Sequence, residues 1–193
     1  ALAPDGDMFK GISDGLVEMV TDEIETFTPT GVRTKGGQQL DADIVITATG
    51  FDLCMLGDVD VTVNGDKVDF ADTVTYRGMM FTGVPNLAWV FGYFRASWTL
   101  RADLISDLMC RLFEHMDQLG VTVVTPQLRP DDADMELGQW VDEDSFNPGY
   151  LVRGQHLMPR RGDKPEWQHT QDYWNERNVL PAADLDDGCL IYR

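Results

Sequence analysis

Residues 99–119 carry the pattern that most limits what this chain can fold into. Apolar side chains recur there every three or four positions, a spacing that places them on one face of a helix. Ser97 or Thr99 can cap the start of such a helix, and Gly120 suits the position just past its end. The sequence therefore predicts one long helix whose apolar face must be covered, with these members: Leu100, Leu104, Ile105, Leu108, Met109, Leu112, Phe113, Met116 and Leu119.

Two continuous apolar runs predict buried strands. Residues 87–92 end at Gly92 and lead through the loop 93–97 into the helix. Residues 43–49 form a β-branched run that ends at Gly50. Runs of this kind suit strands covered on both faces, as in a parallel sheet, so the fold class expected is α/β.

Shorter strands and turns are expected between and beside these runs. Strands are predicted at 16–21, 24–35, 73–82 and 121–125. The Gly36-Gly37 turn makes 24–46 a hairpin or meander, and Asn64-Gly65 marks the tip of a polar hairpin over 59–70.

The character of the sequence changes after Pro126. Residues 127–193 are rich in Pro, Gly, Asp and Trp and predict an irregular extension that packs on a partner domain. Short helices are expected near 132–141 and 167–178, with four bulky anchors: Trp140, Trp167, Tyr173 and Trp174.

Composition excludes some classes of partner. The 193 residues carry a net charge of −18, which repels nucleic acid and disfavours an anionic membrane surface. No apolar run approaches the roughly 20 residues of a membrane span. Three cysteines without CxxC spacing suit a reducing cytoplasm. The start Ala-Leu-Ala-Pro, without Met, indicates a truncated or processed piece.

Two places are candidate ligand sites. The first backbone N–H groups of a helix lack internal partners and lie at the positive end of its dipole, so the start near Ser97, Trp98 and Thr99 suits an anion or an electron-rich carbonyl. An ordinary crossover with a polar cap explains the same residues. Thr49 and Gly50 end a strand in small residues that let a ligand approach, or they simply form a turn.

These segments carry a resemblance. Asp-Ala-Asp-Ile-Val-Ile-Thr-Ala-Thr-Gly-Phe-Asp (41–52) resembles the ATG segment of flavin-containing and Baeyer–Villiger monooxygenases, and residues 83–104 look like the family's last strand–loop–helix. The 7–15 and 24–34 segments and Phe-Asn-Pro-Gly-Tyr (146–150) are similar to a subgroup that includes a mycobacterial ethionamide-activating enzyme.

The resemblance implies a partial FAD/NAD(P)-binding Rossmann-like fragment. Residues 1–42 would end the NADPH domain, 43–126 would be the C-terminal part of the FAD domain, and 127–193 an extension packed on both. The parent enzyme would use FAD and NADPH to insert one oxygen atom of O₂, through a C4a-peroxyflavin, into a ketone or a soft nitrogen or sulfur centre of a small molecule. Flavin contacts are expected at Thr49, Gly50, Ser97, Trp98 and Thr99, with Trp98 also facing substrate.

The sequence also departs from the family. It has no GxGxxG and no FxGxxxHxxxW-type signature, so it lacks both phosphate cradles, and it offers no catalytic residue. The missing N-terminal FAD/NADPH half is therefore an expected partner, and this chain alone is expected to be inactive. A non-catalytic partner-binding or dimerisation module, and a small α+β domain unrelated to flavins, remain alternatives.

Other polar groups favour structural roles. His115, His156 and His169 are scattered without metal-ligand spacing, so no metal site is expected. Arg160-Arg161 is interpreted as a surface pair rather than a phosphate site. The acidic residues between 131 and 144 lack EF-hand spacing and are interpreted as a solvated face.

Overall fold

The computed structural model describes residues 4–142 and 147–193 of the chain. They form two compact units, residues 1–49 and 50–193, each of which is described by itself. Glu143, Asp144 and Phe146, which belong to segments singled out in the sequence, lie outside the described residues.

The first unit holds a short helix and a small antiparallel sheet. Helix α1 spans Asp7–Ser13, and strands β1 (Ile24–Thr28), β2 (Gly31–Thr34) and β3 (Gln39–Asp41) pair in chain order. The predicted meander is confirmed. Residues 24–35 are two strands rather than one bent strand, and Gly31 starts β2 where a Cβ would lie 2.0 Å from the Leu40 carbonyl oxygen.

Two predicted strands of this unit are wrong. Residues 16–21 and 43–49 have no regular structure, and the side chains of Ile44 and Ile46 are 80% and 86% exposed. A strand forms when a neighbour satisfies its backbone and covers its side chains, and no described residue pairs with either segment.

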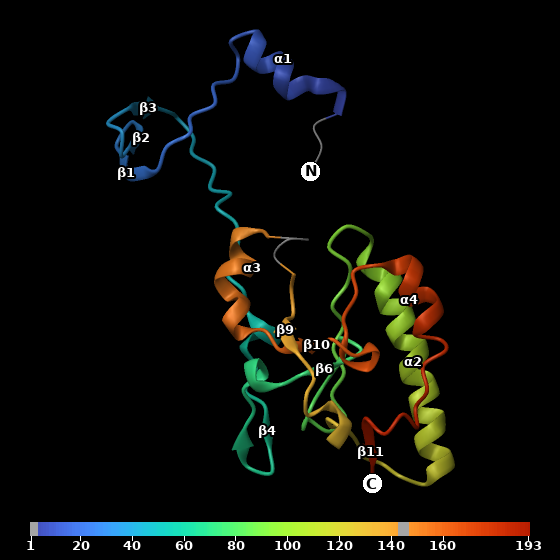
Figure 1. Cartoon of the computed structure of the whole chain (residues 1–193). Coiled ribbons are helices and arrows are strands. Elements are labelled where there is room, and N and C mark those ends of the chain that lie inside the picture. The colour runs from blue at the N-terminus through green and yellow to red at the C-terminus, as the bar shows by residue number, and fades with distance from the viewer. Residues whose placement is uncertain (1–3, 143–146) are drawn as a thin grey trace. The chain divides into compact units, whose positions relative to one another are not determined.

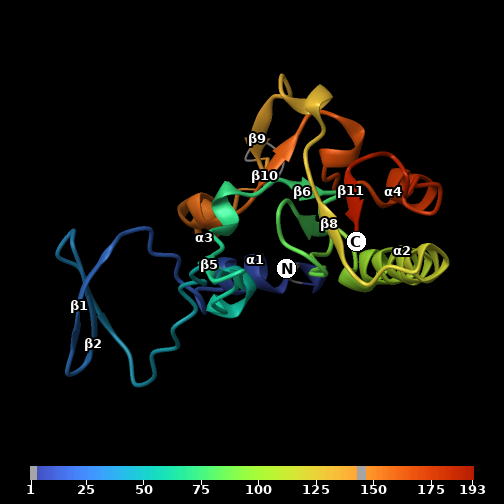
Figure 2. The ribbon, with the colours of Figure 1, turned by 90° about the horizontal axis from the view of Figure 1, so that it is seen from below.

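The second unit is built from antiparallel strand pairs (Figures 1 and 2). Strands β4 (Thr62–Val63) and β5 (Asp66–Lys67) confirm the predicted hairpin, with positive φ angles at Asn64 and Gly65. The expected 73–82 strand is itself a hairpin of β6 (Thr75–Tyr76) and β7 (Met80–Phe81).

Distant parts of the chain meet in the remaining pairs. Strand β8 (Val124–Pro126) pairs with β11 (Leu190–Tyr192), side by side in Figure 2, and β9 (Leu137–Gln139) pairs with β10 (Arg160–Gly162). The extension after Pro126 therefore completes the fold of its own unit, because β11 pairs with β8 and Arg160 of β10 forms a bridge with Val74. The helix expected near 132–141 is wrong, since β9 lies there.

Helices flank these strands (Figure 1). Helix α2 spans Trp98–Leu119 and ends at a left-handed Gly120, as the sequence predicts. Helix α4 (Tyr173–Val179) runs beside it in Figure 1, and α3 is Gly149–Gly154. The core under α2 contains two of the four expected anchors, Trp140 and Trp167, while Tyr173 is half-buried and Trp174 is exposed.

The run 87–92 is not the covered strand that the sequence predicts. Its one ladder contact is the bridge between Ala88 and Met80 of β7. The Trp89 N–H donates to the Met79 carbonyl oxygen, so by strand alternation the N–H and C=O groups of Ala88 and Val90 face away from β7. Trp89 is buried while Ala88 and Val90 are exposed, which leaves one side of this run open.

Candidate functional site at the start of helix α2

The first turn of α2 presents backbone donors that no side chain caps. Ser97 has the extended backbone of an N-cap residue, yet its Oγ lies 2.8 Å from Thr99 Oγ1 rather than on a backbone N–H. Within the described residues, no side chain caps this end of the helix. The dipole of a long helix makes such an end attractive to an electron-rich group.

Trp98 forms an aromatic wall beside these donors. Its indole is 51% exposed and packs against the Phe91 ring, with centroids 5.0 Å apart. The contact requires a glycine at position 92, because a Cβ there would lie 2.3 Å from Trp98 Cγ. Gly92 therefore lets the ring fold back over the end of the preceding segment.

A buried ion pair fixes the second turn of the helix. Arg101 is fully buried and its Nε donates to Glu176 Oε2 at 3.0 Å. The guanidinium also donates to the carbonyl oxygens of Phe91 at 2.8 Å and Arg77 at 3.0 Å. Tyr93 donates its hydroxyl to the same Glu176 carboxylate, and burial and that carboxylate raise the pKa of the Tyr93 phenol.

A second polar group holds the loop before the helix. Gln171 Oε1 accepts the Phe94 N–H at 2.6 Å, and Gln171 Nε2 lies 3.3 Å from the Gly92 carbonyl oxygen and 3.0 Å from His169 Nε2. The His169 ring stacks on Trp140 with centroids 3.9 Å apart. Burial, then the charges of Arg101 and Arg161, lower the pKa of His169 well below its usual range, so the ring is neutral at pH 7.

Three of the five predicted flavin-contact residues are brought together here. Ser97, Trp98 and Thr99 are consecutive at the helix start and all are exposed. Thr49 closes the first unit and Gly50 opens the second, where its φ is +91° and no atom lies within 4 Å of a Cβ position. The contact of all five with flavin stays a prediction.

The residues beneath this surface were not predicted from the sequence. Arg101 lies four positions before Ile105 on the buried face of α2, and a charged residue on an apolar face was the available signal. Glu176, Gln171 and His169 lie about 70 positions further on, in a segment with weak periodicity, and nothing in their spacing predicted the contact. His115 was expected at the surface but is half-buried, with Nε2 3.0 Å from Asp186 Oδ1 and its ring packed edge-on against Tyr192.

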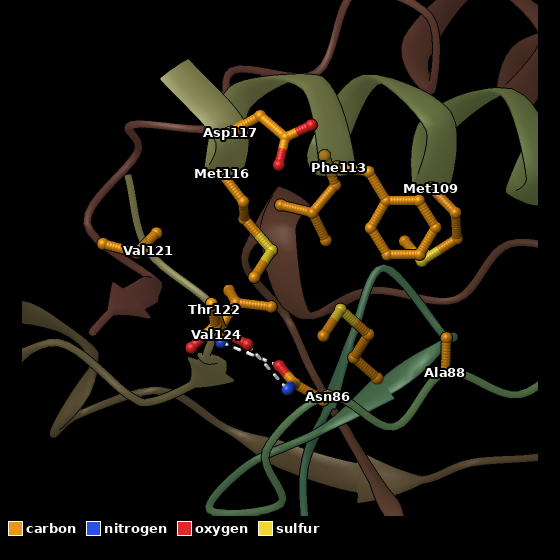
Figure 3. Close-up of a pocket in the computed structure, with 11 residues that line it drawn as sticks. Asn86, Ala88, Met109, Phe113, Met116, Asp117, Val121, Thr122 and Val124 are labelled. Carbon is orange, nitrogen blue, oxygen red and sulfur yellow. Dashed lines mark hydrogen bonds between the residues drawn. The ribbon is translucent and has the colours of Figure 1, made fainter. Parts of the chain in front are cut away.

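An apolar groove opens on another face of α2 (Figure 3). Its volume is about 610 Å³, and it lies between the helix and the open side of the 86–90 segment. Met109, Phe113 and Met116 line it from α2, and Ala88 lies opposite. Asn86 marks one end, where its side chain is hydrogen-bonded to the Val124 N–H and the Thr122 carbonyl oxygen.

Residues 4–142 and 147–193 contain no group of three or more His, Cys, Asp or Glu side chains placed to hold a metal ion. Among the same residues, no helix combines the length and apolar character needed to cross a membrane.

Comparison with known proteins shows which proteins the chain is similar to. The chain is homologous along almost its whole length to FAD-containing monooxygenases. It is 42% identical over 191 residues, 99% of this chain, to the FAD-containing monooxygenase EthA of Mycobacterium tuberculosis. It is 41% identical over 189 residues to the FAD-containing monooxygenase MymA of the same organism, and 39% identical over 191 residues to the FAD-binding monooxygenase AlmA of Acinetobacter baylyi.

The match covers part of each relative. This chain spans 38% of the length of EthA, 37% of MymA and 38% of AlmA. No family model matches the chain, and no solved structure matches it. The resemblance noted from the ATG-like and strand–loop–helix segments is confirmed as homology to this class.

Proposed function

We propose that this chain forms one wall of the flavin site of an FAD-dependent monooxygenase that uses NADPH. The observation that carries the proposal is the identity of about 40% to monooxygenases named for FAD, sustained over 98–99% of the chain. The proposed activity is insertion of one oxygen atom from O₂ into a ketone or a soft nitrogen or sulfur centre of a small molecule, in the cytoplasm.

The residues present fit one edge of a flavin. The uncapped first turn of α2 offers N–H donors to the electron-rich N1–C2=O2 edge of the ring system, and the exposed Trp98 indole offers a flat apolar surface beside them. FAD would supply the redox chemistry, while these residues orient it and exclude water. The pyrophosphate must be held elsewhere, because the sequence has no GxGxxG loop.

We propose further that the rest of the polypeptide covers the groove beside α2. By strand alternation the backbone groups of Ala88 and Val90 face away from β7, and Met109 and Phe113 line the apolar groove that adjoins Ala88. A strand added at this edge would satisfy the backbone and bury the groove, as edge strands generally require. The 37–38% coverage of the relatives supports a partner segment from the same polypeptide, which would provide the missing FAD/NADPH half and complete a Rossmann-like sheet.

The test is FAD binding by the full polypeptide that the gene encodes. Flavin fluorescence is followed during titration with FAD, and NADPH oxidation and O₂ consumption are followed with ketone and thioether substrates. The Ser97→Ala/Thr99→Ala variant is expected to bind FAD more weakly, because the side chains that shape the first turn are lost. Ser106→Ala is the matched control, since its hydroxyl donates to the Ala102 carbonyl oxygen further along the same helix.

The outcomes separate two classes of function. Saturable FAD binding that the double variant weakens, with NADPH-dependent oxygen transfer, supports the monooxygenase. The competing function is a non-catalytic dimerisation module, which the open apolar groove favours. A folded, monodisperse polypeptide that binds no FAD and self-associates through Phe113 would replace the first proposal with the second.

A further inference from the structure

We infer that Gln171 is a positioning residue that fixes the loop 92–97 and thereby the direction in which the first turn of α2 faces the flavin. The inference rests on the proposed function, since it concerns the same helix start. Gln171 has no place in the sequence pattern of the site, and it reaches the loop from a segment 77 positions away.

The side-chain amide of Gln171 is hydrogen-bonded to the loop residues on both sides of Tyr93. Its Oε1 accepts the N–H of Phe94 at 2.6 Å, and its Nε2 donates towards the carbonyl oxygen of Gly92 at 3.3 Å. Tyr93 itself is tied to Glu176 through its hydroxyl. Three successive loop residues are thus held by two side chains of the 171–176 segment.

The amide has one favourable orientation because the loop backbone fixes it. Oε1 faces the Phe94 N–H, which donates to it, and Nε2 faces the Gly92 carbonyl oxygen, which accepts from it. His169 is neutral, and its Nε2 lies 3.0 Å from Gln171 Nε2, so the lone pair of this ring nitrogen suits the same orientation. A reversed amide would set oxygen against this lone pair and against the Gly92 carbonyl, and NH₂ against the Phe94 N–H.

The loop position decides where the helix start points. Gly92 lies directly under the Trp98 ring, and the carbonyl oxygen of Phe91, the residue before it, accepts from Arg101 Nη1 at 2.8 Å. The loop is therefore anchored to α2 through Arg101 and to the 169–171 segment through Gln171. Without the hydrogen bonds from Gln171, residues 92–94 are free to move, while the buried Arg101–Glu176 ion pair still holds the rest of α2. The exposed backbone N–H groups of the first turn and the Trp98 ring then lose their fixed orientation.

The experiment compares Gln171→Met with Gln168→Met in the full polypeptide. Methionine keeps the length of glutamine and removes its amide. Gln168 is the matched control, because it is three positions away and its amide is bonded to the Asp163 carbonyl oxygen rather than to the loop. Three quantities are measured: the dissociation constant for FAD, the visible circular dichroism of bound flavin, and hydrogen exchange of the Phe94 amide.

The expected result is specific to the loop. Gln171→Met should weaken FAD binding about tenfold, change the flavin dichroism and speed exchange at Phe94, with the urea midpoint of global unfolding close to that of Gln168→Met. Unchanged affinity and dichroism in Gln171→Met would overturn the inference. So would a loss of affinity that only follows a lowered unfolding midpoint in both variants.

Failure of the proposed function gives a different pattern. If the unsubstituted polypeptide binds no FAD, the flavin site itself is wrong and the positioning role falls with it. Exchange at Phe94 still reports separately whether Gln171 holds the loop, because that measurement needs no flavin.

Discussion

Replacing Gly92 with alanine should damage the start of α2 more than an equivalent change elsewhere. The added Cβ would lie 2.3 Å and 2.5 Å from two ring atoms of Trp98 and 2.7 Å from its Cα. The ring can rotate away, but the Cα belongs to the helix backbone and cannot. Gly92 does not have a left-handed φ, so the effect is one of space and not of backbone strain.

The magnitude follows from two losses. Overpacking a filled site costs about 1–3 kcal/mol, and moving the indole off Phe91 forfeits an aromatic pair worth about 0.5–1.5 kcal/mol. Alanine also lowers the entropy of the unfolded chain relative to glycine, which offsets about 0.4–1 kcal/mol. Gly138→Ala has the same entropic offset, and its Cβ would make only ordinary contacts with Arg161, at 3.5 Å from Nε and 3.7 Å from Cγ. The difference between the two variants should therefore be about 1.5–4.5 kcal/mol.

Urea unfolding followed by tryptophan fluorescence measures this difference. With a slope of about 2 kcal/mol per molar urea, the midpoint of Gly92→Ala should lie about 1–2 M below that of Gly138→Ala. In a Trp98→Ala background the penalty should shrink, because two of the three close contacts are ring atoms. Midpoints that agree within about 0.2 M would refute the reasoning.

Three further results are expected. Arg101→Ala should destabilise the fold by about 3–5 kcal/mol in the same assay, because it leaves the buried Glu176 carboxylate without its charge partner. Burial raises the pKa of Asp132, but hydrogen bonds from Arg129, Lys164 and Trp167 outweigh it and lower that pKa. Its stabilising contribution is therefore complete above about pH 4 and is lost as the pH falls further, and Asp132→Asn should flatten the acid side of the stability curve. Burial, then Asp187, raise the pKa of the Cys189 thiol to about 12, so a disulfide reagent at pH 8 should titrate two of the three thiols in the native chain, the exposed ones, Cys54 and Cys110.

Local signals predicted the elements that depend on local chemistry. Helix α2 follows from its apolar period and from Gly120, and the β4–β5 hairpin follows from Asn64-Gly65. Both are set by residues close in sequence, through hydrogen bonds within one segment or across one turn. The candidate site was located for the same reason, since a helix start is visible in sequence.

Features that depend on contacts between segments far apart in the chain could not be predicted from the sequence. Strand β9 was expected to be helical, yet its partner β10 lies more than 20 positions away and overrides the local preference. The support for the candidate site has the same origin. Gln171 and Glu176 reach the loop from the far end of the chain, and no period connects them to Tyr93 or Phe94.

The failed strand predictions at 43–49 and 87–92 bear on what could cover these runs. The runs 43–49 and 87–92 have the composition of strands covered on both faces, yet Ile44, Ile46 and Val90 are exposed. Exposed β-branched runs and an open strand edge are costly in water and invite association. Strand-like composition in an exposed run supports the proposal that a further segment covers it. Near the 87–92 run, the apolar groove beside Ala88 offers a surface that such a segment would bury, and this chain spans 37–38% of the length of MymA and EthA.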